Sequence, residues 1–216
     1  MFQLSVQAAH SYVRRVLDEL VSAESIGMLG CLDSVDLHRL VEGFLVEAAV
    51  RVHNNAPAIL LDGMSAMNGE DYEASLADGV ITITMLKDTI RMASIKVEDS
   101  PIVVSDLIPE DSAEGRKQLN QYVRGVYDDP RVVLAKQWAA DHRPIFKYYS
   151  TEKETMPGIS LEYVPYPNLI ESVVSICPRL EYAVLNEVAA MVLDALSEHD
   201  KAVLYRTKAK EYMEGK

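Results

Sequence analysis

Residues 178–213, PRLEYAVLNEVAAMVLDALSEHDKAVLYRTKAKEYM, predict two helices joined by a very short turn. At about 100° per residue, the polar side chains of the first helix fall into one sector, and only Glu181 lies well outside it. The residues in this sector are Asn186, Glu187, Asp194, Ser197 and Glu198. Leu, Val and Met fill the remaining arc, which is wider than the apolar stripe of an ordinary surface helix. We therefore expect this helix to have neighbours on most of its sides.

Two further helices are predicted near the N-terminus. Apolar residues recur at helical spacing from Ser5 to about Glu24, with charged residues between them. A second amphipathic helix, which Asp33 or Ser34 can cap, ends before Pro57. These two helices and the pair at the C-terminus are expected to pack as one bundle.

Residues 57–79, PAILLDGMSAMNGEDYEASLADG, are acidic, contain glycine and methionine, and are too long for a simple connection. We expect an extended loop or arm. Met64, Met67 and Leu76 give this segment apolar anchors that could become ordered against a neighbouring subunit. The alternative is a long surface loop with two incidental methionines.

The hydrophobic period changes at Val80, because VITITML (80–86) alternates apolar and polar residues as a β-strand does. TIRMASIKV, RVVLAKQWA, PIFKYYS and ISLEYVPY predict further strands, and a short helix is expected after Pro109. The domain plan is a helical pair at 1–56, the arm at 57–79, a β region at 80–168 and a helical hairpin at 169–216. The fold class is therefore α+β, with N- and C-terminal helices forming a bundle around a small central antiparallel β region.

Composition limits the possible functions. Of 216 residues, 33 are acidic and 21 basic, which gives a net charge of −12 and argues against a non-specific grip on nucleic acid. No apolar run approaches the roughly 20 residues of a membrane span, and the N-terminus has no secretory signal pattern. Cys31 and Cys177 stand far apart, so we expect reduced buried thiols.

No constellation of residues predicts catalysis, a cofactor or a metal site. The five histidines have no second His or Cys at metal-ligand spacing, so surface or cap roles are expected for His10, His38, His53, His142 and His199. Ser65 lies in GMSAM, which lacks the last glycine of a nucleophile elbow and does not follow a strand. Tyr148, Tyr149, Tyr163 and Tyr166 lie beside acidic residues, which favours a sheet or protein-interface role over base stacking.

The order of these features resembles the head-to-tail connector proteins of short-tailed bacteriophages, also called adaptor or ring proteins, and most closely the ring proteins of crAss-like phages. The resemblance covers nearly the whole chain. It rests on the paired N-terminal helices, ADGVITITMLKDTIRMASIKV (77–97), DDPRVVLAKQW (128–138), RPIFKYYST (143–151), ISLEYVPYP (159–167) and the closing helical hairpin.

This resemblance implies a structural virion protein, made in the host cytoplasm, that forms a homo-oligomeric ring of twelve copies below the portal. Portal protein and other tail or ring proteins would be its partners, and DNA would pass through the channel without specific binding. No membrane, cofactor or enzymatic activity is implied. The interface residues that we expect are Met64, Met67, Leu76, Tyr163, Tyr166, Val188 and Met191.

Two other classes of function stay open. An acidic protein-binding module, such as an assembly or regulatory factor without catalysis, would use acidic faces to hold a basic partner. An enzyme without a recognised motif would need a nucleophile, a base and an orienting group, and the sequence does not bring such a set together.

Overall fold

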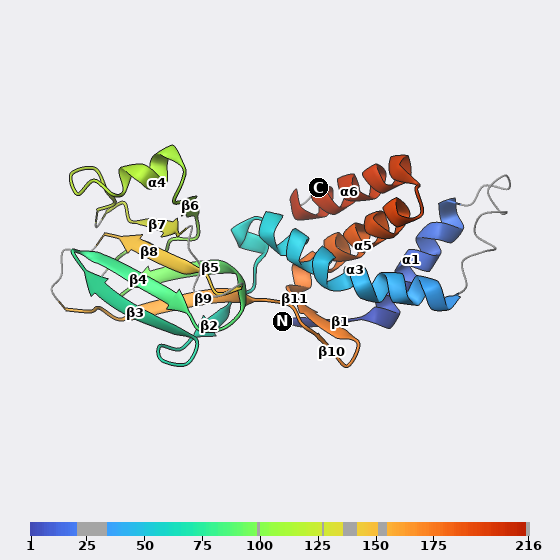
Figure 1. Ribbon diagram of the computed structural model, residues 1–216, viewed down its shortest axis with the longest axis horizontal. Helices are drawn as coiled ribbons and strands as arrows, with labels where there is room; N and C mark the ends of the chain where they lie inside the picture. The colour runs from blue at the N-terminus through green and yellow to red at the C-terminus, as the bar shows by residue number, and fades with distance from the viewer. Residues whose placement is uncertain (21–33, 99, 127, 136–141, 151–154, 215–216) are drawn as a thin grey trace. The chain divides into compact units, whose positions relative to one another are not determined.

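The computed structural model describes residues 1–20, 34–98, 100–126, 128–135, 142–150 and 155–214. Within these ranges the protein has mixed α+β structure, as expected. The chain divides into two compact units (Figure 1). Unit 1 contains residues 1–62 and 167–216, and unit 2 contains residues 63–166.

Four long helices make up most of unit 1. Helices α5 and α6 form the expected C-terminal pair, and α1 and α3 correspond to the expected N-terminal pair. The bounds of the unit 1 helices are α1 Val6–Leu20, α3 Ser34–Asn55, η1 Ala58–Leu60, η2 Pro178–Leu180, α5 Glu181–Ala195 and α6 His199–Glu214. The turn expected around Gly27–Gly30 and the cap expected at Asp33 lie outside the described residues.

Helix α5 is buried by elements of its own chain. It packs against α1, α3 and α6, and Figure 1 shows it between α6 and the other two helices. Every residue from Ala183 to Leu193 except Glu187 is buried. Even Asn186, which belongs to the polar sector of the helix, is fully buried. The wide apolar arc is thus explained within one chain, and a neighbouring subunit is not required to cover α5.

A small sheet, which was not expected from the sequence, completes unit 1. Its order is β1-β11-β10, with antiparallel pairing throughout. The strands are β1 Phe2–Ser5, β10 Leu169–Ile170 and β11 Val173–Ile176. The segment 169–216 is therefore more than the expected helical hairpin: it begins with the β-hairpin of β10 and β11, and its helices follow only after Cys177.

Unit 2 is built from two sheets around one core. One sheet has the order β3-β4-β8-β7-β6, in which only β6 and β7 run parallel, and the other has the order β2-β9-β5. The bounds are β2 Met64–Ala66, β3 Tyr72–Ala77, β4 Val80–Met85, β5 Thr89–Val97, β6 Leu107–Pro109, β7 Arg131–Leu134, β8 Ile145–Tyr149 and β9 Ile159–Pro165. The helix α4, Ala113–Lys117, starts at the cap Ser112 instead of directly after Pro109.

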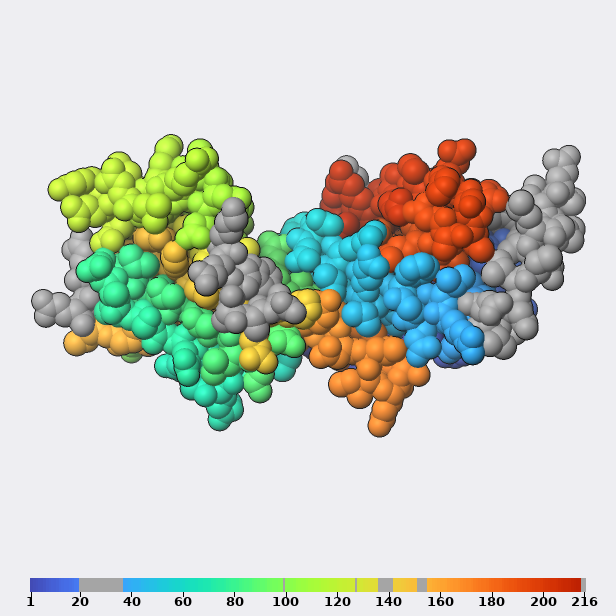
Figure 2. Space-filling model, in the orientation of Figure 1, coloured from blue at the N-terminus to red at the C-terminus, as the bar shows by residue number. Residues whose placement is uncertain are grey.

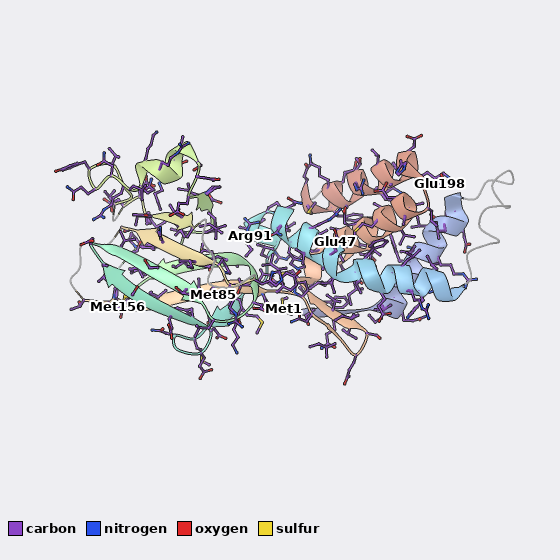
Figure 3. The ribbon with its side chains drawn as sticks, in the orientation of Figure 1. Met1, Glu47, Met85, Arg91, Met156 and Glu198 are labelled. Atoms are coloured by element: carbon purple, nitrogen blue, oxygen red, sulfur yellow. The ribbon has the colours of Figure 1, made fainter. Side chains whose placement is uncertain are left out.

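The unit 2 core lies between the inward faces of the two sheets. Ile81, Ile83 and Met85 alternate with partly exposed residues along β4, as the sequence pattern predicts. Phe146 and Leu161 contribute from β8 and β9 to the same cluster. In Figure 3, the label Met85 lies among the strands of this unit. Each sheet thus buries one face on the other, which is the arrangement of a β-sandwich.

The expectation of an extended arm at 57–79 was wrong. Strand β2 pairs with β9, and β3 pairs with β4 along its whole length, from Tyr72 opposite Met85 to Ala77 opposite Val80. Tyr72 is buried in the core. Most of this segment therefore belongs to unit 2, which starts at Gly63 instead of Val80.

Candidate interaction surfaces

Of the interface residues expected in the segment 57–79, two are exposed. Met64 and Met67 expose 46% and 55% of their surface, whereas Leu76 is partly buried and packs against the unit 2 core. Met64 lies on β2, at an edge of the three-stranded sheet. Met67 starts a turn in which its backbone N–H donates to Asp71 Oδ2 over 2.9 Å. The two methionines are thus held by an ordered edge and turn.

Val188 and Met191 cannot lie at a subunit surface. Both are on α5, with exposed fractions of 0% and 6%, and are covered by the rest of unit 1. The broad apolar arc that suggested a lateral contact is instead the centre of the helical core. These two interface assignments are corrected to core positions.

Tyr163 is also a core residue, because β9 is the middle strand of its sheet and this side chain points into the sandwich. Its hydroxyl lies 3.4 Å from Asp71 Oδ1, and burial raises the pKa of Tyr163. Tyr166, just after β9, is partly buried, and its ring stacks on His142 with centroids 3.9 Å apart. Of the two tyrosines expected at an interface, Tyr163 is therefore buried, and only Tyr166 has exposed surface that a partner could contact.

Of the surface or cap roles expected for the histidines, His53 does not have a surface role. It is buried at the end of α3, where Nδ1 lies 2.7 Å from the carbonyl oxygen of Ala49. The backbone N–H of Cys177 donates to His53 Nε2 over 3.0 Å. Nδ1 therefore carries the proton and Nε2 accepts, which is the neutral tautomer. Burial lowers the pKa of His53.

The contact between His53 and Cys177 does not form a catalytic dyad. His53 Nε2 is occupied by the backbone N–H of Cys177, so it cannot take a proton from the thiol. Cys177 Sγ instead accepts from the backbone N–H of Asp62 over 3.3 Å, and burial raises the pKa of the thiol. A buried thiol with a raised pKa is a poor nucleophile. Cys177 is free and buried, as expected, and Cys31 lies outside the described residues.

No three His, Cys, Asp or Glu side chains in the described part of the chain are grouped so that they could hold a metal ion. In unit 1, a groove of about 670 Å³ is lined by residues of α3, α5 and α6. Two of its basic side chains contact acidic residues: Arg51 of α3 contacts Glu47 of α3 and Glu187 of α5, and Arg206 of α6 contacts Asp194 of α5. None of the helices formed by the described residues has the length and apolar character needed to cross a bilayer.

Helix α6 carries an exposed surface that was not expected from the sequence, and we call it the α6 stripe. Its members fall within an arc of about 100° on the helix. They are Asp200, Val203, Leu204, Thr207, Glu211 and Glu214. Val203 and Leu204 expose 59% and 48% of their surface. Figure 2 shows α6, at the red end of the colour scale, on the surface of unit 1.

A second exposed surface in unit 2 was also missed, and we call it the α4 loop, residues 113–126. It contains α4 and the turns that follow it (Figure 2, yellow-green). Four apolar side chains of this loop are exposed by 58–85%: Leu119, Tyr122, Val123 and Val126. The sequence predicted only a short helix after Pro109, whereas the helix ends at Lys117 and exposed turns follow it.

Comparison of the chain with protein-family models, with curated proteins and with solved structures gives no match.

Proposed function

We propose that this protein is a structural subunit of a ring in the head-to-tail connector of a short-tailed bacteriophage. The observation that carries the proposal is the exposure of large apolar side chains on ordered elements of both units. Tyr122 of the α4 loop exposes 85% of its surface, and Val203 and Leu204 are exposed in the N-terminal half of α6. Apolar side chains gathered on ordered surface elements mark sites of protein association.

A ring subunit needs two different lateral surfaces, because each copy has one neighbour on either side. Contacts of this head-to-tail kind close into rings when the rotation between copies permits it. The α6 stripe and the α4 loop are two separate surfaces of unlike composition, which supports this arrangement. The ring would be a homo-oligomer of twelve copies placed below the portal, with other tail proteins as further partners.

The charge of the chain supports passage of DNA through such a ring. A net charge of −12 disfavours tight contacts with phosphates, so duplex DNA can move along an acidic channel without being held. In this proposal the DNA is cargo, and no residue reads its sequence. The proposed location is the virion, after assembly in the host cytoplasm.

The test is assembly of the purified chain with its cognate portal protein. Native mass spectrometry and light scattering should find small species for the chain alone and a ring-sized complex once portal is added. A subunit docked on the portal meets its neighbour at high effective concentration, so portal should promote lateral contact. A chain that stays monomeric in the presence of portal and every other tail component would refute the proposal and favour an acidic protein-binding module.

A further inference from the structure

The charges of the α6 stripe are unlike those of the rest of α6. All three of its ionisable residues, Asp200, Glu211 and Glu214, are acidic. Several basic side chains of α6 are engaged away from the stripe. Lys201 lies 3.1 Å from Glu198, Arg206 binds Asp194, and Lys208 stands 4.3 Å from the centroid of the Tyr205 ring.

Lys210 borders the stripe and lies 3.9 Å from Glu214, so it offsets part of the negative charge at the C-terminal end. Asp200 and Glu211 stand on either side of the exposed pair Val203 and Leu204 along the helix. The surface offered to a partner is therefore an apolar centre with a predominantly acidic edge.

The α4 loop has the opposite charge. It contains Arg116, Lys117 and Arg124, and its one acidic residue, Glu114, lies 3.8 Å from Arg131. Arg116 Nε donates to the carbonyl oxygen of Ser112, and Arg124 donates to the carbonyl oxygen of Asp78. Both of these contacts are with neutral groups, so they orient the two cations without cancelling their charge.

The loop holds its shape through a buried side chain. Gln118 is 5% exposed, and its Oε1 accepts a hydrogen bond of 2.8 Å from the backbone N–H of Gly125. This bond closes the turns that carry the exposed Tyr122 and Val123. Asn120 supports the same turn, because its Oδ1 accepts from the N–H of Tyr122 over 3.0 Å. A loop already ordered in the free protein loses less entropy when it binds.

We propose that the α4 loop of one copy docks on the α6 stripe of a second copy of this chain. Leu119, Tyr122 and Val123 would cover Val203 and Leu204, while Arg116, Lys117 and Arg124 would face Asp200 and Glu211. The occupant is a second copy because this chain supplies both an acidic and a basic apolar surface. This inference rests on the proposed function, since it identifies the lateral contact of the ring.

The charge argument is tested by a charge swap. Lys117→Glu and Glu211→Lys should each weaken self-association at least tenfold, measured by sedimentation velocity over a concentration series up to millimolar. An equimolar mixture of the two variants should recover association, because the loop Glu of one copy then meets the helix Lys of the other. Two variants that each associate as well as the wild type would overturn the inference, and so would a wild-type chain that remains monomeric at millimolar concentration.

The head-to-tail geometry is tested with the apolar residues. Tyr122→Ser destroys one surface and Leu204→Ser destroys the other, so neither variant should associate alone. Mixed together, they should form a dimer and nothing larger, because each copy keeps one working surface. Ile170→Ser is the matched control, since Ile170 is 68% exposed on β10 and lies outside both surfaces. Circular dichroism of each variant checks that it is folded, and growth beyond dimers in the mixture would overturn the inference.

These measurements separate the inference from the proposed function. If the chain forms portal-dependent rings and the Tyr122 and Leu204 variants do so equally well, the lateral contact is wrong and the connector role stands. If both variants lose self-association while portal recruits no ring, the contact is correct and the connector role is wrong.

Discussion

At the residue scale, His53 links the end of α3 to the segment that leads into α5. Its two ring nitrogens bond to Ala49 and Cys177, which are far apart in sequence, and the sequence offered no pattern for this contact. The sequence pattern around a single histidine in a helix does not predict whether its side chain is exposed or buried. His53 is buried because the fold brings Cys177 next to the end of α3, and this contact joins residues that are far apart in the sequence.

The buried, neutral state of His53 makes the stability of the protein depend on pH. The folded pKa is lowered from 6.5, so as pH falls below about 6.5 the unfolded chain takes up a proton that the folded chain does not. The contribution of His53 to the free energy of unfolding should therefore be fully present above pH 6.5. Below that pH it should decline, by at most about 1.4 kcal/mol per pH unit for one proton. Urea unfolding between pH 7.5 and 5 measures this slope.

His53→Gln should reduce the slope, because this variant has no imidazole at position 53 to take up the proton. Burial also lowers the pKa of His10, so a smaller slope of the same sign should remain in the His53 variant. An identical slope in the wild type and in His53→Gln would show that His53 contributes nothing to acid sensitivity.

Val188→Asp tests the revised position of this residue in the core. The substitution places a carboxylate with no designed partner at a site of 0% exposure, so it should cost on the order of 3 kcal/mol or more in the free energy of unfolding. Val203→Asp is the matched control, because Val203 is 59% exposed, and it should change that energy by less than about 1 kcal/mol. Denaturant unfolding of the isolated chain measures both, and equal effects would place Val188 outside the core.

At the element scale, strong periodicity was predictable and long-range pairing was not. The four long helices were expected from their apolar spacing, and β4, β5, β8 and β9 were expected from alternation and β-branched residues. Strand β3 was missed because Glu73 and two alanines weaken the strand signal, although Tyr72, Ala74 and Leu76 do alternate with exposed residues. The small sheet was missed because β1 pairs with β11, which lies at the other end of the sequence.

The candidate surfaces were predictable only in part. Met64 and Met67 were expected at an interface and are exposed in the chain, whereas Val188 and Met191, which were also expected at an interface, are core residues. The α6 stripe could have been found, because an apolar pair lies among acids within one arc of that helix. The α4 loop could not, because nothing in its composition shows that the helix stops at Lys117 and that Gln118 closes the following turns.

The hairpin between β3 and β4 did carry a local signal, the dipeptide Asp78-Gly79, which is typical of tight β-turns. Both residues have positive φ, 51° and 69°. Gly79→Ala should therefore destabilise the protein by about 1 kcal/mol, because a Cβ is unfavourable in the left-handed region. Gly43→Ala is the control, because it should change the stability in the opposite direction. Gly43 lies in α3, and a Cβ added there would have no neighbouring atom within 4 Å. Alanine should therefore stabilise the protein by about 0.5–1 kcal/mol. Thermal unfolding of both variants measures these changes in stability. If both substitutions changed the stability in the same direction, the turn assignment would be contradicted.

At the scale of the whole molecule, the chain leaves unit 1 once and returns to it once. Unit 2 is the single continuous stretch 63–166, whereas unit 1 combines the two ends of the chain. Unit 2 has its own core, formed by both of its sheets. It therefore has what a domain needs in order to fold alone, while unit 1 depends on both chain ends being present.

We predict that a fragment of residues 63–166 folds by itself. It contains all strands of both unit 2 sheets, so it should give a β-type circular dichroism spectrum and a cooperative thermal transition. The control is a fragment of residues 80–166, which starts where the sequence pattern alone placed the β region. That fragment lacks β2 and β3, exposes one edge of each sheet and removes Tyr72 from the core. It should fail to fold cooperatively, because bare strand edges and a missing core side chain both favour aggregation over a unique structure. Equal cooperativity of the two fragments would show that residues 63–79 are an appendage, as the sequence alone had suggested.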